Sequence, residues 1–151
     1  MHTQVRRFLH AALAFLTIGL GLGWWLLVRR EWRGQYPAPL ETSAHVHLLL
    51  VGFVMLMIMG VALWMFPRPA KDDRWYKPVL ATAAWWLVVP GTLLRGVTEW
   101  GAPPVHGPAT RWAILAGATA QVVGLVLFFA TMISRIRSVG SRQREANGER
   151  F

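Results

Sequence analysis

The stretch from Ala44 to Phe66 reads AHVHLLLVGFVMLMIMGVALWMF and holds 23 residues without a single Asp, Glu, Lys or Arg. A helix of about 20 predominantly apolar residues crosses the ~30 Å hydrocarbon core of a bilayer. A helix on the surface of a soluble domain would instead carry charged residues on the face turned to water. This stretch therefore predicts a transmembrane helix.

Three further stretches, 8–28, 78–94 and 112–134, also lack charged residues. The shortest of them extends past Arg95, because an arginine near a helix end reaches the interface with its long side chain. The connectors between the stretches are too short to form another domain. We predict an all-α membrane protein, a four-transmembrane-helix bundle within residues 1–137. Its helices are expected at about 8–28, 44–66, 78–98 and 111–134, and a polar C-terminal tail at 138–151.

The charge distribution predicts an orientation in the membrane. Only 15% of the 151 residues are charged, whereas soluble proteins average about 25%. With the N-terminus in the cytoplasm, 11 of the 16 Lys and Arg residues lie on the cytoplasmic side, the side that such residues favour. We therefore expect both termini to be cytoplasmic in a multi-pass protein of the inner (cytoplasmic) membrane. Because the basic residues border apolar stretches, nucleic acid is not an expected partner despite the net charge of +9.

The absence of cysteine excludes disulfides, thiolate metal sites, iron–sulfur clusters and covalent c-type heme attachment. Five His and seven acidic residues then remain as possible ligands or bases, and imidazole is the expected protein ligand for any heme. The richest cluster of polar residues is Ser43-Ala44-His45-Val46-His47, at the start of the second predicted helix. Helical residues two apart point about 200° away from each other, so His45 and His47 should face different neighbours and should not share one metal ion.

Gly52 lies two turns below His45 on the same predicted face. A glycine there removes side-chain bulk beneath the imidazole. The space would either accommodate a flat macrocycle or allow another helix to pack closely. The sequence leaves both alternatives open.

The run HVHLLLVGFV from His45 to Val54 and the ending WMFPR from Trp64 to Arg68 resemble the second transmembrane helix of the heme-copper oxidase catalytic subunit. The resemblance is greatest to C-type cytochrome oxidases, nitric oxide reductases and the small nitric-oxide-response membrane proteins related to them. The first histidine of this helix is an axial ligand of the low-spin heme in that family. The resemblance thus implies that His45 ligates a heme b. It covers about 25 of the 151 residues.

Several features of that family are missing from this chain. It has no later histidine-rich helix, no copper site is recognisable, and it is not expected to act as a complete heme-copper oxidase. The sixth iron ligand would come from His106, from His45 or His47 of a neighbouring copy, or from solvent or a gas. His106 is the leading protein candidate, because it precedes the fourth helix on the same side of the membrane as His45.

Heme propionates prefer cationic partners at an aqueous edge. Arg95 is the best placed residue, with Arg111 and Trp100 as neighbouring alternatives. Arg95 is equally suited to an ion pair with Glu99, four residues further on. The expected site therefore comprises two iron ligands and five further heme contacts: His45 and His106, then His47, Gly52, Arg95, Arg111 and Trp100.

Three functions remain open from the sequence. The first is a heme b protein that transfers electrons or handles a small gas such as nitric oxide or oxygen. The second is a non-catalytic assembly or interaction subunit of a respiratory membrane complex, and the third is a small heme-dependent membrane oxidoreductase, for which His10 is the cue. Whether the chain is an enzyme is left undecided.

The expected partners are the lipid bilayer, a redox partner or respiratory subunit, and further copies of this chain. Four helices leave little protein to surround a macrocycle, so a homo-oligomer is expected. Small residues allow close contact between membrane helices. The candidate faces are Gly19, Gly21 and Gly23 in the first helix and Ala113, Ala116, Gly117, Ala120 and Gly124 in the fourth.

Overall fold

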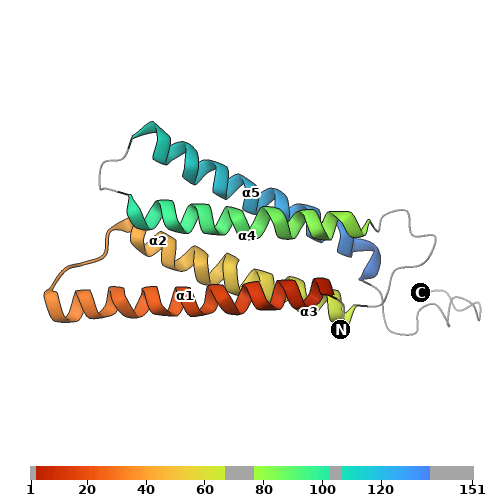
Figure 1. Ribbon diagram of the computed structural model, residues 1–151, viewed down its shortest axis with the longest axis horizontal. Coiled ribbons are helices and arrows are strands. Elements are labelled where there is room, and N and C mark those ends of the chain that lie inside the picture. Colours follow the sequence, from red (N-terminus) through yellow and green to blue (C-terminus); the bar gives the residue numbers. More distant parts are fainter. Residues whose placement is uncertain (1–2, 67–76, 103–106, 137–151) are drawn as a thin grey trace, which may run out of the picture.

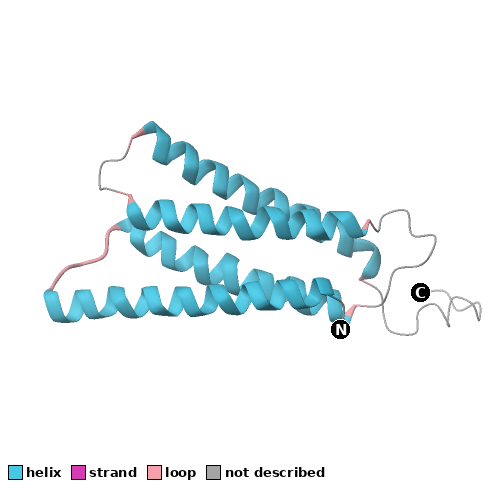
Figure 2. Cartoon of the chain, in the orientation of Figure 1, coloured by secondary structure: helices cyan, strands magenta, loops and turns pink. Residues whose placement is uncertain are grey.

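The computed structural model describes residues 3–66, 77–102 and 107–136, and within these ranges the regular structure is entirely helical (Figure 2). Its elements are α1 (Thr3–Arg33), α2 (Pro39–His47), the π-helix η1 (Leu48–Met55), α3 (Leu56–Met65), α4 (Pro78–Gly101), α5 (Pro108–Met132) and the short 3₁₀ helix η2 (Ile133–Arg135).

Four helical segments are long and apolar enough to cross a membrane: Thr3–Arg33, Pro39–Met65, Val79–Gly101 and Pro108–Met132. The second combines α2, η1 and α3 into one continuous rod. The four-transmembrane-helix prediction is therefore confirmed. The cytoplasmic location of the termini stays a prediction, and the predicted tail at 138–151 lies outside the described residues.

The helices extend beyond the charge-free stretches that predicted them. α1 begins at Thr3 and ends at Arg33, whereas its apolar stretch covers 8–28. The other long segments start at or beside a proline, at Pro39, Pro78 and Pro108. Proline is suited to the first helical turn because its φ is already helical and its missing N–H has no partner to lose there.

The helices follow one another side by side in the order α1, then the α2–η1–α3 rod, then α4, then α5 (Figure 1). We name the two ends of the bundle by their residues. The His45 end is where α1 ends and α2 begins, and the Arg6 end is where α1 begins. α5 diverges from the other helices toward the His45 end. Near the Arg6 end the rings of Phe8 and Phe128, 5.8 Å apart, join α1 to α5.

Close backbone contact holds α4 against α5. A Cβ placed on Gly117 would lie 2.8 Å from the carbonyl oxygen of Gly91, and one on Gly124 would lie 2.7 Å from a methyl group of Val88. Such contacts replace hydrophobic burial as the cause of helix association in a membrane, since lipid is as apolar as the helices.

The same contacts correct part of the expected oligomer interface. Gly117 and Gly124 pack within the chain, and so do Gly19 and Gly23, which face the second segment. They are therefore not available to a second copy. Gly21 differs from them, because a Cβ there would meet nothing within 4 Å.

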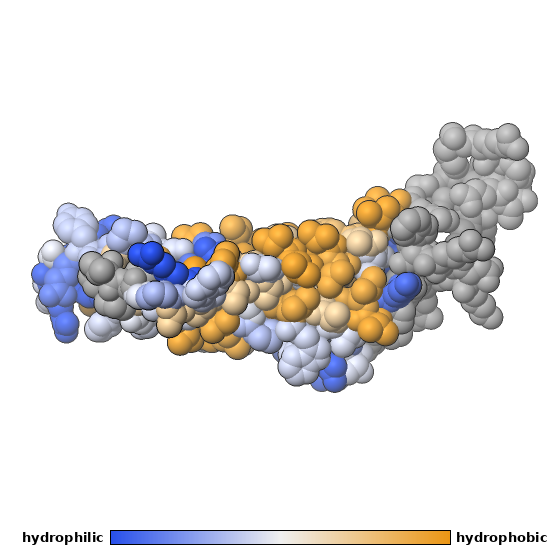
Figure 3. Space-filling view, turned by 90° about the horizontal axis from the view of Figure 1, so that it is seen from above, coloured by the Kyte–Doolittle hydropathy of each residue, from blue (hydrophilic) through white to orange (hydrophobic). Residues whose placement is uncertain are grey.

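The surface has the pattern of a membrane protein. On the face shown in Figure 3, apolar side chains occupy most of the middle, and hydrophilic ones gather at the His45 end. Trp32, Trp64 and Trp112 lie near helix ends, Trp24 lies near the end of the apolar stretch of α1, and each of the four is more than two-thirds exposed. Tryptophan prefers the membrane–water interface, so these residues fit two aromatic belts.

Candidate functional site

An ion pair at the His45 end fixes the start of α2. Both guanidinium Nη atoms of Arg29 in α1 contact the carboxylate of Glu41, with 2.8 Å between Nη1 and Oε1. Glu41 also accepts a hydrogen bond from the backbone N–H of Ala38, at 2.7 Å. A two-pronged contact of this kind restrains orientation as well as distance. It holds the first turn of α2, and with it the cluster at Ser43–His47, against the end of α1.

His45 lies in a notch on the surface of α1. Its Nδ1 is 3.0 Å from the carbonyl oxygen of Gly19. A Cβ on Gly23 would be 2.5 Å from Cε1 of the imidazole, 3.1 Å from Nδ1 and 3.2 Å from Nε2. Only a residue without a side chain leaves room for the ring at this position. The imidazole therefore packs directly on the backbone of α1.

This contact defines the chemistry of the His45 ring. A carbonyl oxygen can only accept a hydrogen bond, so Nδ1 must carry the proton and donate it. In the neutral ring the lone pair then lies on Nε2. His45 is half-buried, so part of the side chain remains accessible.

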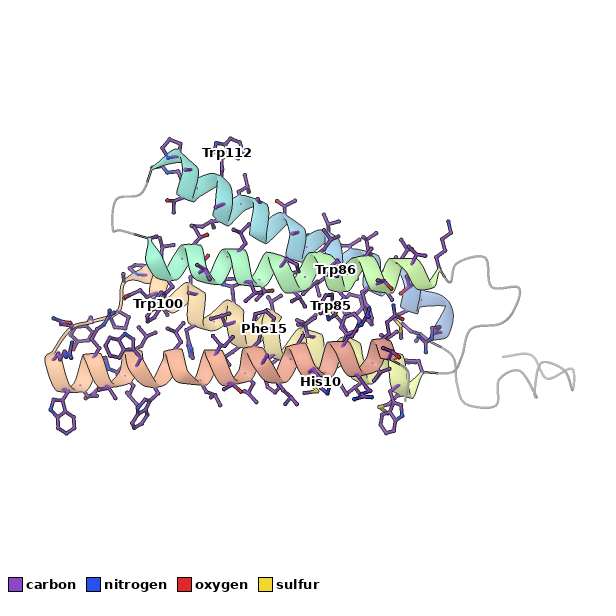
Figure 4. All side chains as sticks on the ribbon, viewed as in Figure 1. His10, Phe15, Trp85, Trp86, Trp100 and Trp112 are labelled. Carbon is purple, nitrogen blue, oxygen red and sulfur yellow. The ribbon has the colours of Figure 1, made fainter. Side chains whose placement is uncertain are left out.

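The space next to Gly52 is filled by an aromatic ring. A Cβ on Gly52 would lie 2.6 Å from Cγ of Phe15, which is 3% exposed. Of the two alternatives for this glycine, close helix packing is the one that the structure contains. Figure 4 shows Phe15 and Trp85 in the region between α1 and α4, whereas Trp112 projects outward from α5.

His47 faces a different helix from His45, as the 200° separation predicts. Its Nδ1 is 2.8 Å from the carbonyl oxygen of Ser43 and 3.2 Å from the Ser43 hydroxyl. On the α4 side, Oε2 of Glu99 is 3.9 Å from the same nitrogen. Because the serine and the carboxylate both approach Nδ1, these three residues do not form the relay of a serine hydrolase, which needs one partner on each ring nitrogen.

A buried polar network continues from Glu99 through α4 and α5. Arg95 donates to Oε1 of Glu99 at 2.7 Å and to the amide oxygen of Gln121 at 3.3 Å. Gln121 donates in turn to the hydroxyl of Thr92 at 3.1 Å, and Thr92 to the carbonyl of Val88. The sequence left open whether Arg95 contacts a heme propionate or pairs with Glu99. The structure contains the pair with Glu99.

Glu99 is the most unusual member of this network. Only 1% of the residue is exposed, and its Oε2 atom has no hydrogen-bond partner among the described residues. Polar groups inside a membrane bundle are costly to bury and are candidates for function by default. Gln121 is not among the predicted site residues, although it is the only amide side chain in the sequence from 112 to 134.

The remaining predicted residues are less closely connected. Trp100 is 37% exposed and Arg111 is exposed, both near the His45 end. His106 lies outside the described residues. His10 is exposed on α1 nine residues before Gly19, which corresponds to about 14 Å along the helix, so it cannot bind the same metal ion as His45.

Within the described residues, no group of three or more His, Asp or Glu side chains is arranged to hold a metal ion. Comparison with protein-family models, with curated proteins and with solved structures found no match to this chain.

Proposed function

We propose that this chain is a heme b-binding integral membrane protein related to the heme-copper oxidase catalytic subunit, in which Nε2 of His45 would hold the heme iron. The single observation that carries the proposal is the hydrogen bond between Nδ1 of His45 and the carbonyl of Gly19. Histidines that ligate metals almost always donate their other ring N–H to a carboxylate, a carbonyl or water, which fixes the tautomer and the ring orientation.

The residues that could ligate iron in the described part of the chain are compatible with a heme. The sequence offers no thiolate, and a porphyrin supplies four nitrogen ligands, so one accessible imidazole is enough to attach it. His45 is half-buried, and its Nε2 has no hydrogen-bond partner among the described residues, which leaves that nitrogen for this bond. The space beside Gly52 does not fit a macrocycle, because the Phe15 ring occupies it. Heme would therefore be held at the accessible side of His45.

Each residue around His45 then has a physical role. The Gly19 carbonyl orients the imidazole, and Gly23 allows the ring to lie against α1. Phe15 excludes water from the region below. When bound, heme would supply one-electron transfer if the protein provided two iron ligands, and binding of a small gas if it provided one.

A second iron ligand would not come from His47 of the same chain, because that residue faces α4 and not α1. His106, a histidine of a neighbouring copy, solvent or a gas remain as candidates. For the propionates, Arg95 is already paired with Glu99 and Gln121, which makes the exposed Arg111 and the neighbouring Trp100 the better candidates.

An optical spectrum tests this function. The protein would be purified from heme-replete cells and measured oxidised, reduced, and reduced under carbon monoxide. We expect a Soret band in the purified protein. A spectrum unchanged by carbon monoxide indicates two protein ligands and electron transfer, whereas a shifted Soret band indicates an open position and gas chemistry. A protein without a Soret band contradicts the proposal.

A second candidate function is a non-catalytic subunit of a respiratory membrane complex. It is favoured by an apolar groove of about 470 Å³ on α4 and α5, lined by Leu87, Trp112, Leu115, Ala116, Thr119, Ala120 and Val123. A helix of another subunit would pack there. Co-purification of a respiratory complex with heme-free protein would support this candidate, and stoichiometric heme in the isolated chain would count against it.

A further inference from the structure

The first two turns of α1 carry three basic side chains that the proposed function does not use. Arg6, Arg7 and His10 are all exposed. Arg6 and His10 are four residues apart and therefore lie on one face of the helix, with Arg7 three residues from His10 beside them. None of the three forms an ion pair with a carboxylate of the described residues.

Among the described residues, basic side chains at the Arg6 end have no acidic residue near them to balance their charge. The three acidic residues within the described ranges, Glu31, Glu41 and Glu99, all belong to the opposite end of the bundle, where α1 and α4 end and α2 begins. Lys77, before α4, adds a further exposed cation at the Arg6 end. Asp72 and Asp73 are outside the described residues.

The depth of these side chains matches lipid headgroups. The apolar stretch of α1 starts at Phe8, so Arg6 and Arg7 lie just outside it, and His10 lies two residues, about 3 Å, inside. Arginine side chains at such a position extend toward the interface.

The same face of α1 continues as an apolar strip. Leu13, Thr17 and Gly21 follow His10 at intervals of three or four residues, and all are exposed. The Thr17 hydroxyl donates to the carbonyl of Leu13 at 3.0 Å, so it offers no unsatisfied proton to lipid. A Cβ on Gly21 would meet nothing, so the strip is also unobstructed. It has the length and polarity to contact an acyl chain.

We propose that Arg6, Arg7 and His10 bind the phosphate of an anionic phospholipid, whose acyl chain lies along Leu13, Thr17 and Gly21. Guanidinium groups match phosphate oxygens with paired hydrogen bonds, and the imidazole adds a further donor. The combination of a cationic group and an apolar strip on one helix face selects a lipid over free phosphate. Each arginine near an anionic surface should raise the affinity about five-fold.

The test measures lipid retained by the full chain in mild detergent, using native mass spectrometry. The probes are phosphatidylglycerol, phosphatidylcholine and inorganic phosphate. The variant carries Arg6→Gln, Arg7→Gln and His10→Gln. The control is Arg33→Gln, which removes an exposed arginine at the opposite end of the same helix. Circular dichroism verifies that both variants keep their helical content.

We expect the wild type and the control to retain phosphatidylglycerol in preference to phosphatidylcholine, and the triple variant to lose about 25-fold in affinity for phosphatidylglycerol from its two arginines. Equal retention of the two lipids by the wild type would overturn the proposal. So would unchanged retention in the triple variant, an equal loss in the control, or full displacement of the lipid by inorganic phosphate.

Discussion

The imidazole of His45 lies so close to Gly23 that a Cβ on the glycine would be 2.5 Å from Cε1 of the ring. Together with the hydrogen bond from Nδ1 to Gly19, this contact packs His45 of α2 against α1, and Nε2 has no hydrogen-bond partner in the part of the chain that the structure describes. A polar side chain at a helix–helix contact in a membrane must find a hydrogen-bond partner, and here the partner is a backbone carbonyl. The proposed heme ligand is thus held in place before any heme binds.

Replacing Gly23 with alanine should displace His45. Real Cβ atoms do not come within 2.5 Å of a ring carbon, so either the imidazole rotates or α1 and α2 separate. We expect Gly23→Ala to lose most of its heme, measured as the ratio of Soret to protein absorbance.

Gly21→Ala is the matched control for this variant. It introduces the same methyl group two residues away in the same helix, where nothing lies within 4 Å. Alanine is favoured over glycine in a helix by about 1 kcal/mol, so the control should bind heme normally and be no less stable. Equal heme loss in both variants would show that the space beside Gly23 does not position the His45 ring.

The effects of replacing Arg95 and Glu99 on the stability of the protein should depend on each other. Removing one partner of a buried ion pair leaves an uncompensated charge and typically costs about 3–5 kcal/mol. We expect Arg95→Met to lower the thermal unfolding temperature in detergent strongly, because Glu99 is only 1% exposed.

Adding Glu99→Gln to Arg95→Met should recover part of that loss, since the double variant no longer buries an unpaired charge. Thermal unfolding of the two single variants and the double variant measures the coupling. Destabilisations that simply add would mean that the two side chains do not depend on each other.

Arg135 should stabilise the end of α3. One of its guanidinium nitrogens donates to the carbonyl oxygens of Leu63 at 3.2 Å and Phe66 at 2.9 Å. The last carbonyls of a helix have no partner within the helix. We expect Arg135→Met to destabilise the protein by about 1–3 kcal/mol, the usual cost of leaving such groups unpaired. Arg135→Lys should recover part of this in the same unfolding assay, and equal stability of the wild type and Arg135→Met would contradict the role.

The number and approximate position of the membrane helices were predictable because charge is excluded from the hydrocarbon core. Their ends were not. The apolar pattern stops at the edge of the core, near Phe8 and Val28, while helical hydrogen bonding in α1 continues through the interfacial region from Thr3 to Arg33. The π-helix at Leu48–Met55 could not be predicted from the sequence either. Its eight residues are all apolar or glycine, and such a composition is equally compatible with i→i+4 and i→i+5 hydrogen bonding.

The candidate site was predictable only in part, because local sequence patterns do not determine which helices pack together. Helical geometry alone predicts that His45 and His47 face different neighbours, and this is confirmed. Which neighbours they meet depends on the packing of whole helices. The pairing of His45 with Gly19 and Gly23, and the link from Arg95 to Gln121, join residues 22 to 26 positions apart, beyond the reach of local pattern.

The most direct test of the proposed function is the heme content of His45→Ala, measured by the pyridine hemochrome assay on purified protein. Val46→Ala is its control, because it truncates the neighbouring exposed side chain in the same helical turn. If His45 is the axial ligand, His45→Ala retains little heme, whereas Val46→Ala retains as much as the wild type. Heme content in His45→Ala equal to that of the wild type would contradict the assignment of His45 as the ligand.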